Sequence, residues 1–374
     1  MDAAPGEGKW VRVPYEVGAA DVGGVSFSAG GLLAAPTGEL ILTISFRLRK
    51  SEAWAPAGYE VGFAQYVVQK AEAKTPAREA CELRLTRQGK HITLQSKYLK
   101  VRFDRGWLTS LSFGDGELIA AGPKKDVGLR PNFFRALTDN DMSFLNFVPV
   151  LTKFAPLRIW RFVSRHLSAL RVKAKRLSPS SVRLRVHWSP GACVAYGVRT
   201  VFTVHGSGEI EVEHRAGGLV PMLRVGVRLG LRKELARVQW YGRGPGESYC
   251  DRKTGQKLRL NEADVADLEH RYMRPQENGH RTDVRSLRFT RPDGAGLRIE
   301  GDGGVFEFNA GAHSQERLDD AQHLYELLQD DCIHLCVDGR QRGVGGDMPG
   351  SAFLHAPYKL GPGKYGFKFV MKRA

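Results

Sequence analysis

Cysteines and long hydrophobic runs are scarce in this sequence. Only five cysteines occur among 374 residues, at positions 81, 193, 250, 332 and 336. So odd and sparse a set excludes a disulfide scaffold and is typical of thiols kept reduced in a cytosol. No run approaches the roughly 20 apolar residues that cross a bilayer, and no apolar signal region follows the charged first ten residues. We therefore expect a soluble, cytoplasmic protein with no membrane partner.

The composition also lacks the marks of a disordered or fibrous chain. Hydrophobic residues make up 42% and charged residues 26% of the sequence, enough to build a sizeable core. Its 43 glycines and 18 prolines follow no collagen-like period. Such a share is typical of a turn-rich all-β protein and makes a helical bundle a poor candidate. At about 100–200 residues per domain, the length predicts two domains or at most three.

Acidic residues are missing from one stretch of the chain. The sequence has 56 Lys and Arg against 40 Asp and Glu, a net charge of +16, and residues 151–200 contain no Asp or Glu at all. The basic residues of this segment are Lys153, Arg158, Arg161, Arg165, Arg171, Lys173, Lys175, Arg176, Arg183, Arg185 and Arg199. No helix-turn-helix, zinc-finger spacing or RNA-stacking signature accompanies them, so no specific nucleic-acid partner is predicted. Two interpretations remain: nonspecific binding of polyanions, or a solvated face that docks onto something acidic.

Strand signals dominate the rest of the sequence. Residues 39–46 and 59–68 predict strands of a small sandwich, and the polar, proline-containing residues 71–78 predict a domain boundary. Beyond it, alternating or β-branched residues predict further strands at 91–94, 97–103, 108–113, 182–188, 198–204, 209–214 and 223–229. Helical spacing of apolar residues favours helices at 314–328, capped by Ser314, and at 158–170.

Five blocks of sequence carry a resemblance to a known family. They are VRFDRGWLTSLSFGDGELI (101–119), RPNFFRALTDND (130–141), WYGRGPGESYCDR (240–252), PQENG (275–279), and Asp338 with GVGGD (343–347). In this order they resemble the C-terminal domain of β-galactosidases of glycoside hydrolase family 2, over residues 97–374. Residues 51–61 are similar to the end of the immunoglobulin-like sandwich that precedes this domain in such enzymes.

The resemblance implies a mainly β fold with two domains. Residues 1–76 would form a partial immunoglobulin-like β-sandwich, the end of domain 4, because about 75 residues stand where roughly 100 form a complete one. Residues 77–374 would form a large galactose-mutarotase-like β-supersandwich, similar to domain 5.

The resemblance also implies that the catalytic residues lie outside this chain. In this family a separate (β/α)8 barrel of about 250 residues carries the two catalytic glutamates, and no such barrel fits in this sequence. The chain is thus expected to be the small subunit or C-terminal fragment of a β-galactosidase acting on terminal non-reducing β-D-galactosides. Its partner would be a large chain carrying the barrel. This chain would hold no catalytic residue and no cofactor, although a divalent metal is possible in the assembled enzyme.

Two loops are the candidates for galactoside binding. Arg135, Asp139, Asn140 and Asp141 offer groups that can bond sugar hydroxyls, and in the family this loop lies beside the active site. The alternative is that the two aspartates cap backbone amides and pair with Arg135. In the second loop, formed by Gly345, Gly346 and Asp347, paired glycines permit a close approach to a ligand.

Tryptophan is missing where the family commonly has it. A Trp shortly after the second loop usually forms part of the galactose site, but here Met348, Pro349 and Gly350 follow, and no Trp occurs after Trp240. The resemblance therefore implies a weaker substrate affinity or a loss of activity.

Other polar residues of the blocks are expected to position loops. Glu247, Tyr249, Asp251 and Asn278 more naturally pin loops than touch sugar. A second set, Cys332, His334 and Cys336, alternates along a predicted strand and could share one face. A metal site is conceivable there, but no fourth ligand lies nearby, so a packed thiol-lined face is favoured.

Two other functions remain open at this stage. The chain could be a carbohydrate-binding or interaction module without a hydrolytic partner. It could also be a mutarotase-like enzyme, which uses a histidine acid and a carboxylate base. Of the available histidines, His280, His313 and His355 all fall within or beside a β-galactosidase-like block.

Overall fold

The computed structural model describes residues 39–69, 79–142, 156–347 and 354–374, in two units that comprise residues 1–74 and 75–374. The described part of the first unit contains an antiparallel hairpin of β1 (Leu40–Arg47) and β2 (Glu60–Gln69). These strands lie where the sequence predicts them. Ile41 and Leu42 of β1 are buried, and the rings of Trp54 and Tyr59 meet edge to face near the turn.

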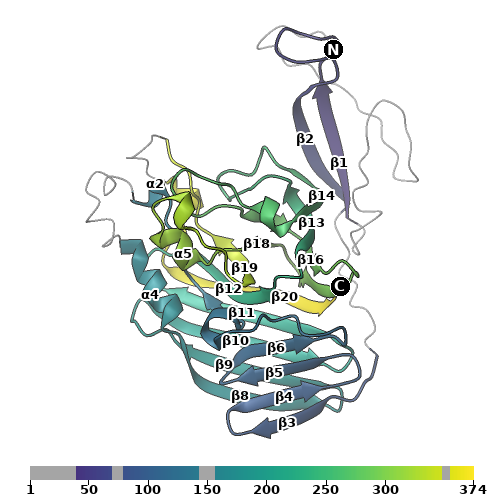
Figure 1. The fold of residues 1–374 in the computed structure, drawn as a ribbon, viewed down its shortest axis with the longest axis vertical. Helices are drawn as coiled ribbons and strands as arrows, with labels where there is room; N and C mark the ends of the chain where they lie inside the picture. Colours follow the sequence, from purple (N-terminus) through teal and green to yellow (C-terminus); the bar gives the residue numbers. More distant parts are fainter. Residues whose placement is uncertain (1–38, 70–78, 143–155, 348–353) are drawn as a thin grey trace. The chain divides into compact units, whose positions relative to one another are not determined.

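The second unit is built from three antiparallel sheets (Figure 1). The nine-stranded sheet has the order β14 (Lys257–Asp264), β13 (Arg237–Gly244), β16 (Ser286–Thr290), β17 (Gly296–Gly301), β20 (Gly363–Arg373), β11 (Ile210–Gly218), β10 (Ala195–His205), β9 (Ser181–Ser189) and β8 (Ser168–Ser178). The five-stranded sheet has the order β15 (Arg281–Val284), β18 (Phe306–Gly311), β19 (Cys332–Gln341), β12 (Arg224–Arg232) and β7 (Arg130–Asn132). The four-stranded sheet runs from β3 (Arg84–Gln88) through β4 (His91–Gln95) and β5 (Lys100–Asp104) to β6 (Trp107–Ser112).

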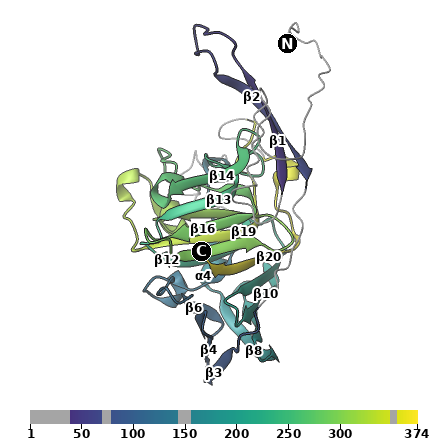
Figure 2. The same ribbon diagram turned by 90° about the vertical axis from the view of Figure 1, so that its right-hand side faces the viewer.

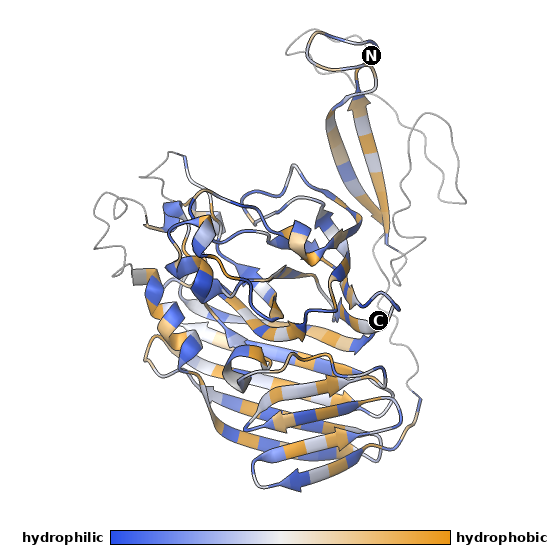
Figure 3. Ribbon diagram, viewed as in Figure 1, coloured by the Kyte–Doolittle hydropathy of each residue, from blue (hydrophilic) through white to orange (hydrophobic). Residues whose placement is uncertain are grey.

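The two shorter sheets cover the same face of the nine-stranded sheet. At one end, Phe103 of the four-stranded sheet meets Phe202 of β10, with ring centroids 5.1 Å apart. At the other end, Phe308 of the five-stranded sheet meets Trp240 of β13 at 5.9 Å. Figure 2 shows the layers from the side, and Figure 3 shows apolar and polar residues alternating along the strands. The mainly β fold class is confirmed.

The helix at 314–328 is shorter than the sequence predicts. Ser314 does cap it, because its hydroxyl accepts a hydrogen bond from the Arg317 N–H at 3.2 Å. However, α5 (Gln315–Asp320) ends when Ala321 becomes extended, and only a 3₁₀ turn (Leu324–Glu326) follows. The physical reason is tertiary: the buried Asp319 carboxylate accepts the Leu137 N–H and pairs with Arg161, which fixes the last turn.

The second predicted helix, at 158–170, also ends early. A 3₁₀ turn (Pro156–Arg158) leads into α4 (Ile159–Arg165), and β8 begins three residues later. Leu170, which the predicted helix at 158–170 would include, is 77% exposed on β8. The reason is the two-residue period of Arg-Val-Lys-Ala-Lys at 171–175, which suits a strand with one buried face.

The remaining short elements lie in the connections. They are α1 (Lys124–Val127), α2 (Asp139–Met142) and the 3₁₀ turns Val265–Leu268 and Ala356–Tyr358. Among the helices of the described ranges, none has the length and apolar character needed to cross a membrane.

Candidate functional site

The loop at 135–141 is organised around a buried ion pair. Arg135 is fully buried, and its Nη1 lies 2.9 Å from Oδ2 of Asp141, whose side chain is 3% exposed. The other end of the guanidinium donates to the Gly343 carbonyl at 3.2 Å. Asp141 also accepts the N–H and hydroxyl of Thr138, both at 3.1 Å. This aspartate thus closes a tight turn at the start of α2 and pairs with an arginine six residues earlier.

The loop at 343–347 is bound to the first loop and to a third. Asn140 donates to the Val344 carbonyl at 2.8 Å. From the other side, Oδ2 of Asp251 accepts the N–H groups of Val344 at 2.9 Å and of Gly345 at 2.7 Å. A Cβ on Gly343 would lie 2.5 Å from the same oxygen, so only glycine fits there. These hydrogen bonds therefore fix three segments that are distant in sequence next to one another.

The outward rim of this loop cluster carries carboxylates that reach solvent. The Asp139 side chain is 54% exposed and pairs with Arg274 at 2.7 Å, while Gln276 donates to its Oδ2 at 3.0 Å. Asp347 is 77% exposed and pairs with His355 at 2.8 Å. These groups, unlike Arg135 and Asp141, are placed where a ligand from solvent can meet them.

A further set of contacts fixes the segments at 247–252 and 269–280. Glu247 accepts the Gly279 N–H at 2.8 Å and also binds Arg252 and Tyr272. Asn278 accepts the His270 N–H at 3.1 Å. Tyr249 is buried and stacks on His280, with ring centroids 5.3 Å apart.

A buried polar network lies among the strands of the five-stranded sheet. Arg224 is fully buried and binds Asp338 and Gln341, each at 2.7 Å. Gln341 in turn donates to Glu277 at 3.2 Å, which connects the segment at 275–279 to β19. Sequence reasoning missed Arg224 and Glu277. The PQENG block contained a signal for Glu277, whereas nothing local distinguishes Arg224 from the other arginines.

Next to this network, the fully buried His280 and the largely buried Glu307 form a pair whose Nε2 and Oε2 atoms are 3.1 Å apart. Burial lowers the pKa of His280 to about 4. Burial, together with the charge of Asp283, raises the pKa of Glu307 to about 8. At neutral pH the carboxyl group therefore keeps its proton and donates it in a hydrogen bond to an unprotonated imidazole.

Cys332, His334 and Cys336 do not come together as metal ligands. The Cys332 sulfur lies 3.6 Å from Nε2 of His334, which pairs with Asp330 at 2.9 Å. Cys336 is buried against the Asn132 amide instead. Across the described ranges, no group of three or more His, Cys, Asp or Glu is placed to hold a metal ion.

The structure brings together most of the residues singled out from the sequence. Arg135, Asn140, Asp141, Asp251 and Gly345 belong to one hydrogen-bonded cluster. Gly346 and Asp347 continue the loop outward, whereas Met348, Pro349 and Gly350, which stand where the family has Trp, lie outside the described residues. Contact of any of these side chains with a galactoside stays a prediction.

The fold is that of a large antiparallel β-sandwich protein. Its candidate site is formed by loops that hydrogen bonds join to one another. Residues 95–371 match the protein family described as "Beta galactosidase small chain", and residues 1–69 match "Beta-galactosidase, domain 4". The chain therefore belongs to the β-galactosidase small chain family.

Individual relatives agree with this assignment. The chain is 34% identical over 334 residues to a β-galactosidase of Priestia megaterium, a match covering 87% of this chain and 30% of that protein. It is 28% identical over 343 residues to a β-galactosidase of Streptococcus thermophilus, covering 90% of this chain and 32% of that protein. The chain thus spans about a third of the length of these relatives.

Among solved structures, the chain is similar to a galactose mutarotase-like protein from Lactobacillus casei. That match has a TM-score of 0.41 and 9% sequence identity, and it covers 78% of this chain and 100% of the other.

The buried ion pair of the loop cluster gives a first testable prediction. Asp141→Ala leaves the buried Arg135 charge without its partner, so we expect the free energy of unfolding to fall by about 3–5 kcal/mol. Asp139→Ala removes a largely exposed partner of Arg274 and should cost less than about 1 kcal/mol. Urea unfolding of both variants measures the difference, and equal losses would contradict the assigned role of the Arg135 pair.

The His280–Glu307 pair predicts a pH dependence of stability. From pH 6.5 to 8 the native state keeps a proton on Glu307 that the unfolded state, with its ordinary pKa of 4.5, has lost. Stability should therefore fall as pH rises, by up to about 1.4 kcal/mol per pH unit from this group. Below pH 6.5 the depressed pKa of His280 acts in the opposite direction, because there the unfolded state binds the extra proton.

Glu307→Gln keeps a donor to His280 but cannot titrate. Urea unfolding between pH 6.5 and 8 should therefore show a flatter profile for Glu307→Gln than for the unmodified chain. The control Glu262→Gln changes an exposed carboxylate whose pKa lies below its usual value because Gln239 and Arg237 bind it, so its profile should keep the original slope. Parallel profiles for all three proteins would refute the protonated state of Glu307.

Proposed function

We propose that this chain forms the non-barrel part of a β-galactosidase that hydrolyses terminal non-reducing β-D-galactosides. The observation that carries the proposal is the match of residues 95–371 to the small chain family. The coverage of only 30–32% of full-length relatives supports it. The sheets of the described ranges are antiparallel and include no (β/α)8 barrel. The two catalytic glutamates would then belong to a large chain, or to another part of a longer enzyme.

In this proposal the loop cluster forms one wall of the galactoside site. Asp139, Asn140 and Asp347 would offer carboxylate and amide groups to sugar hydroxyls. Arg135 and Asp141 would act as positioning residues, because both are buried and hold the loop from behind. Glu247, Tyr249, Asp251 and Asn278 would keep the neighbouring segments in place. The assembled enzyme could also hold a divalent metal. We place the protein in the cytoplasm.

A mutarotase-like activity gains no support from the geometry. His280 and Glu307 do form a histidine–carboxylate pair, but His280 is fully buried and stacked under Tyr249. An acid and a base for that reaction must reach the substrate within hydrogen-bond distance.

Co-expression tests the proposal. The purified chain alone should give no detectable turnover of an aryl β-galactoside, because it lacks the two acids that break the bond. Together with a β-galactosidase chain that carries the barrel, the chain should co-purify and restore turnover. Robust turnover by the chain alone, or a barrel chain equally active without it, would overturn the proposal.

Asp251 allows a sharper test in the assembled enzyme. Asp251→Ala removes the acceptor of the Val344 and Gly345 N–H groups, so the loop at 343–347 should lose its position. We expect kcat/KM for the aryl galactoside to fall by about 10- to 100-fold, the usual penalty for displaced positioning groups. The control Asp267→Ala, at an exposed 3₁₀ turn, should leave kcat/KM unchanged. An unchanged kcat/KM in Asp251→Ala would remove this loop from the site.

A further inference from the structure

The outer face of the nine-stranded sheet, opposite the two covering sheets, carries a dense set of basic side chains. Strand alternation turns Val172 and Ala174 of β8 toward the core, so Arg171, Lys173 and Lys175 point outward. Arg185 of β9 and Lys364 and Lys368 of β20 are exposed on the same face. This set of six residues is called the outer basic face below.

The strand register opposes like charges directly. Lys173 pairs with Arg185, Lys175 with Arg183, and Arg199 with Arg215. Side chains at such positions lie about 4.5–5.5 Å apart at Cβ, and like charges there destabilise a sheet. An anionic ligand would offset this cost.

Few carboxylates neutralise this face. Glu213 binds Arg199 at 3.6 Å and Arg215 at 2.5 Å. In the described part of the chain, none of the six residues of the outer basic face has a carboxylate within ion-pair distance. Arg158 and Arg161, from the same acid-free segment, are by contrast paired with Asp319. Apart from Arg165 of α4, the described cations of this segment that have no carboxylate partner therefore lie on the sheet.

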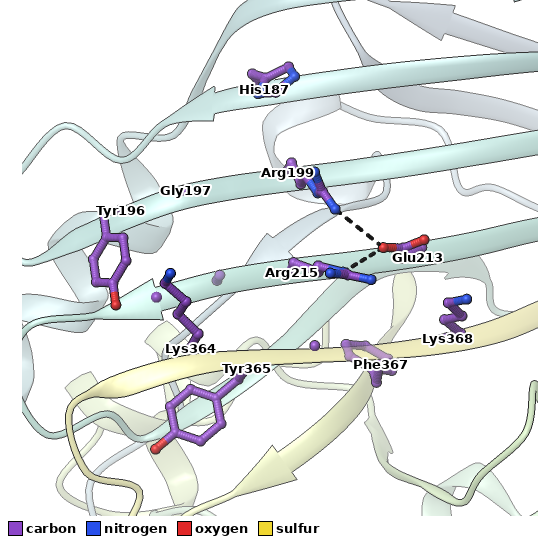
Figure 4. A pocket seen from close by; sticks show the side chains of 13 residues that line it. His187, Tyr196, Gly197, Arg199, Glu213, Arg215, Lys364, Tyr365, Phe367 and Lys368 are labelled. Atoms are coloured by element: carbon purple, nitrogen blue, oxygen red, sulfur yellow. Dashed lines mark ion pairs between the residues drawn. The ribbon is translucent and has the colours of Figure 1, made fainter.

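A hollow of about 720 Å³ lies on this face, over β9, β10, β11 and β20 (Figure 4). Its floor lacks side chains at Gly197, Gly217 and Gly366. The Tyr196 ring lies directly over Gly217, because a Cβ there would be 2.4 Å from a ring carbon. Lys364 and Lys368 line the hollow together with the Arg199–Glu213–Arg215 group.

We propose that this hollow binds an oligosaccharide of uronic acids, at a site separate from the galactoside-binding loops. A sugar ring would pack on Tyr196, carboxylates of the oligosaccharide would pair with Lys364 and Lys368, and a hydroxyl would donate to Glu213. The carboxylates of such a ligand recur along its length. The cations of the sheet recur from one strand to the next, and neighbouring strands are about 4.8 Å apart.

Two features favour an acidic sugar over a nucleic acid. Proteins that bind single strands stack successive bases on several aromatic rings, whereas the rings that strand alternation places on the outer side of this hollow are those of Tyr196 and His187. The Phe367 ring, although its backbone lines the hollow, packs against Gly339 of β19 on the inner side. Glu213 would also repel a phosphate chain but accepts hydroxyl groups.

Titration calorimetry of the full chain with an oligogalacturonate, at about 0.15 M salt, tests the proposal. We expect binding that weakens at least tenfold in Tyr196→Ala and in the double variant Lys364→Ala with Lys368→Ala. A matched double variant on the β3–β4 hairpin, Arg84→Ala with Lys90→Ala, removes two exposed cations elsewhere and should bind as the unmodified chain does.

Comparison ligands make the test decisive. A neutral oligogalactoside of the same length should bind at least tenfold more weakly, since it lacks the carboxylates. The proposal is overturned if the oligogalacturonate does not bind, if both outer-face variants bind it unchanged, or if oligothymidylate of equal charge binds more tightly. Thermal unfolding of each variant shows that it is folded, and the lysine double variant keeps the test valid should Tyr196→Ala fail to fold.

Discussion

One constraint shapes the second unit: the nine-stranded sheet has a single apolar face that must be covered along its whole length. Alternate residues of its strands, such as Val186, Phe202 and Leu287, are completely buried on that face. No one sheet of the fold is wide enough to cover it. The four-stranded sheet covers the end around Phe202, and the five-stranded sheet covers the end around Trp240. The long sheet thus links two cores into one continuous apolar cluster.

The five-stranded sheet also determines where the buried polar network lies. Its strands bury the Arg224–Asp338 pair, and the backbone of β12 approaches it so closely that a Cβ on Gly226 would lie 1.8 Å from the Asp338 carboxylate. A charged pair in such a place is tolerated only when further hydrogen bonds accompany it, and Gln341 supplies one. The segments at 135–141, 275–279 and 343–347 are tied to this sheet, so their geometry depends on a rigid support rather than on their own loop conformation.

Sequence reasoning succeeded where a signal is local. The strands at 182–188, 198–204 and 209–214 show a two-residue period because each has one buried face, and β9, β10 and β11 lie there. The pairing of Arg135 with Asp141 is also local, since the two are six residues apart, whereas Asp139, which the alternative interpretation also paired with Arg135, binds Arg274 instead. The end of the helix at 314–328 was misjudged because distant residues decide it: Asp319 is held by Arg161 and Leu137 across more than 150 positions. The end of the helix at 158–170 was misjudged although its signal, the two-residue period at 171–175, is local.

No pattern in the sequence predicts which loops are joined by hydrogen bonds. Asp251 binds Val344 across 93 positions, and only the resemblance to a known family gave a reason to consider these segments together. Arg224 shows the same limit, because its burial follows from sheet packing and not from its neighbours along the chain. Sequence therefore identifies which segments matter more readily than it identifies the buried residues that hold them.

The distribution of basic residues over the second unit also follows from the way its sheets and helices are layered. The acid-free segment supplies α4, β8, β9 and the first half of β10. On α4, Arg161 meets Asp319 and Asp320 of α5, which packing brings from far along the chain. The outer face of a sheet receives only the alternate residues of its own strands, and there Glu211 and Glu213 are already engaged by His205 and by two arginines. Neighbouring strands are about 4.8 Å apart, closer than the screening length of about 8 Å at physiological salt. Charges on adjacent strands therefore act together, and a ligand that spans several strands experiences their sum, which a small isolated anion does not.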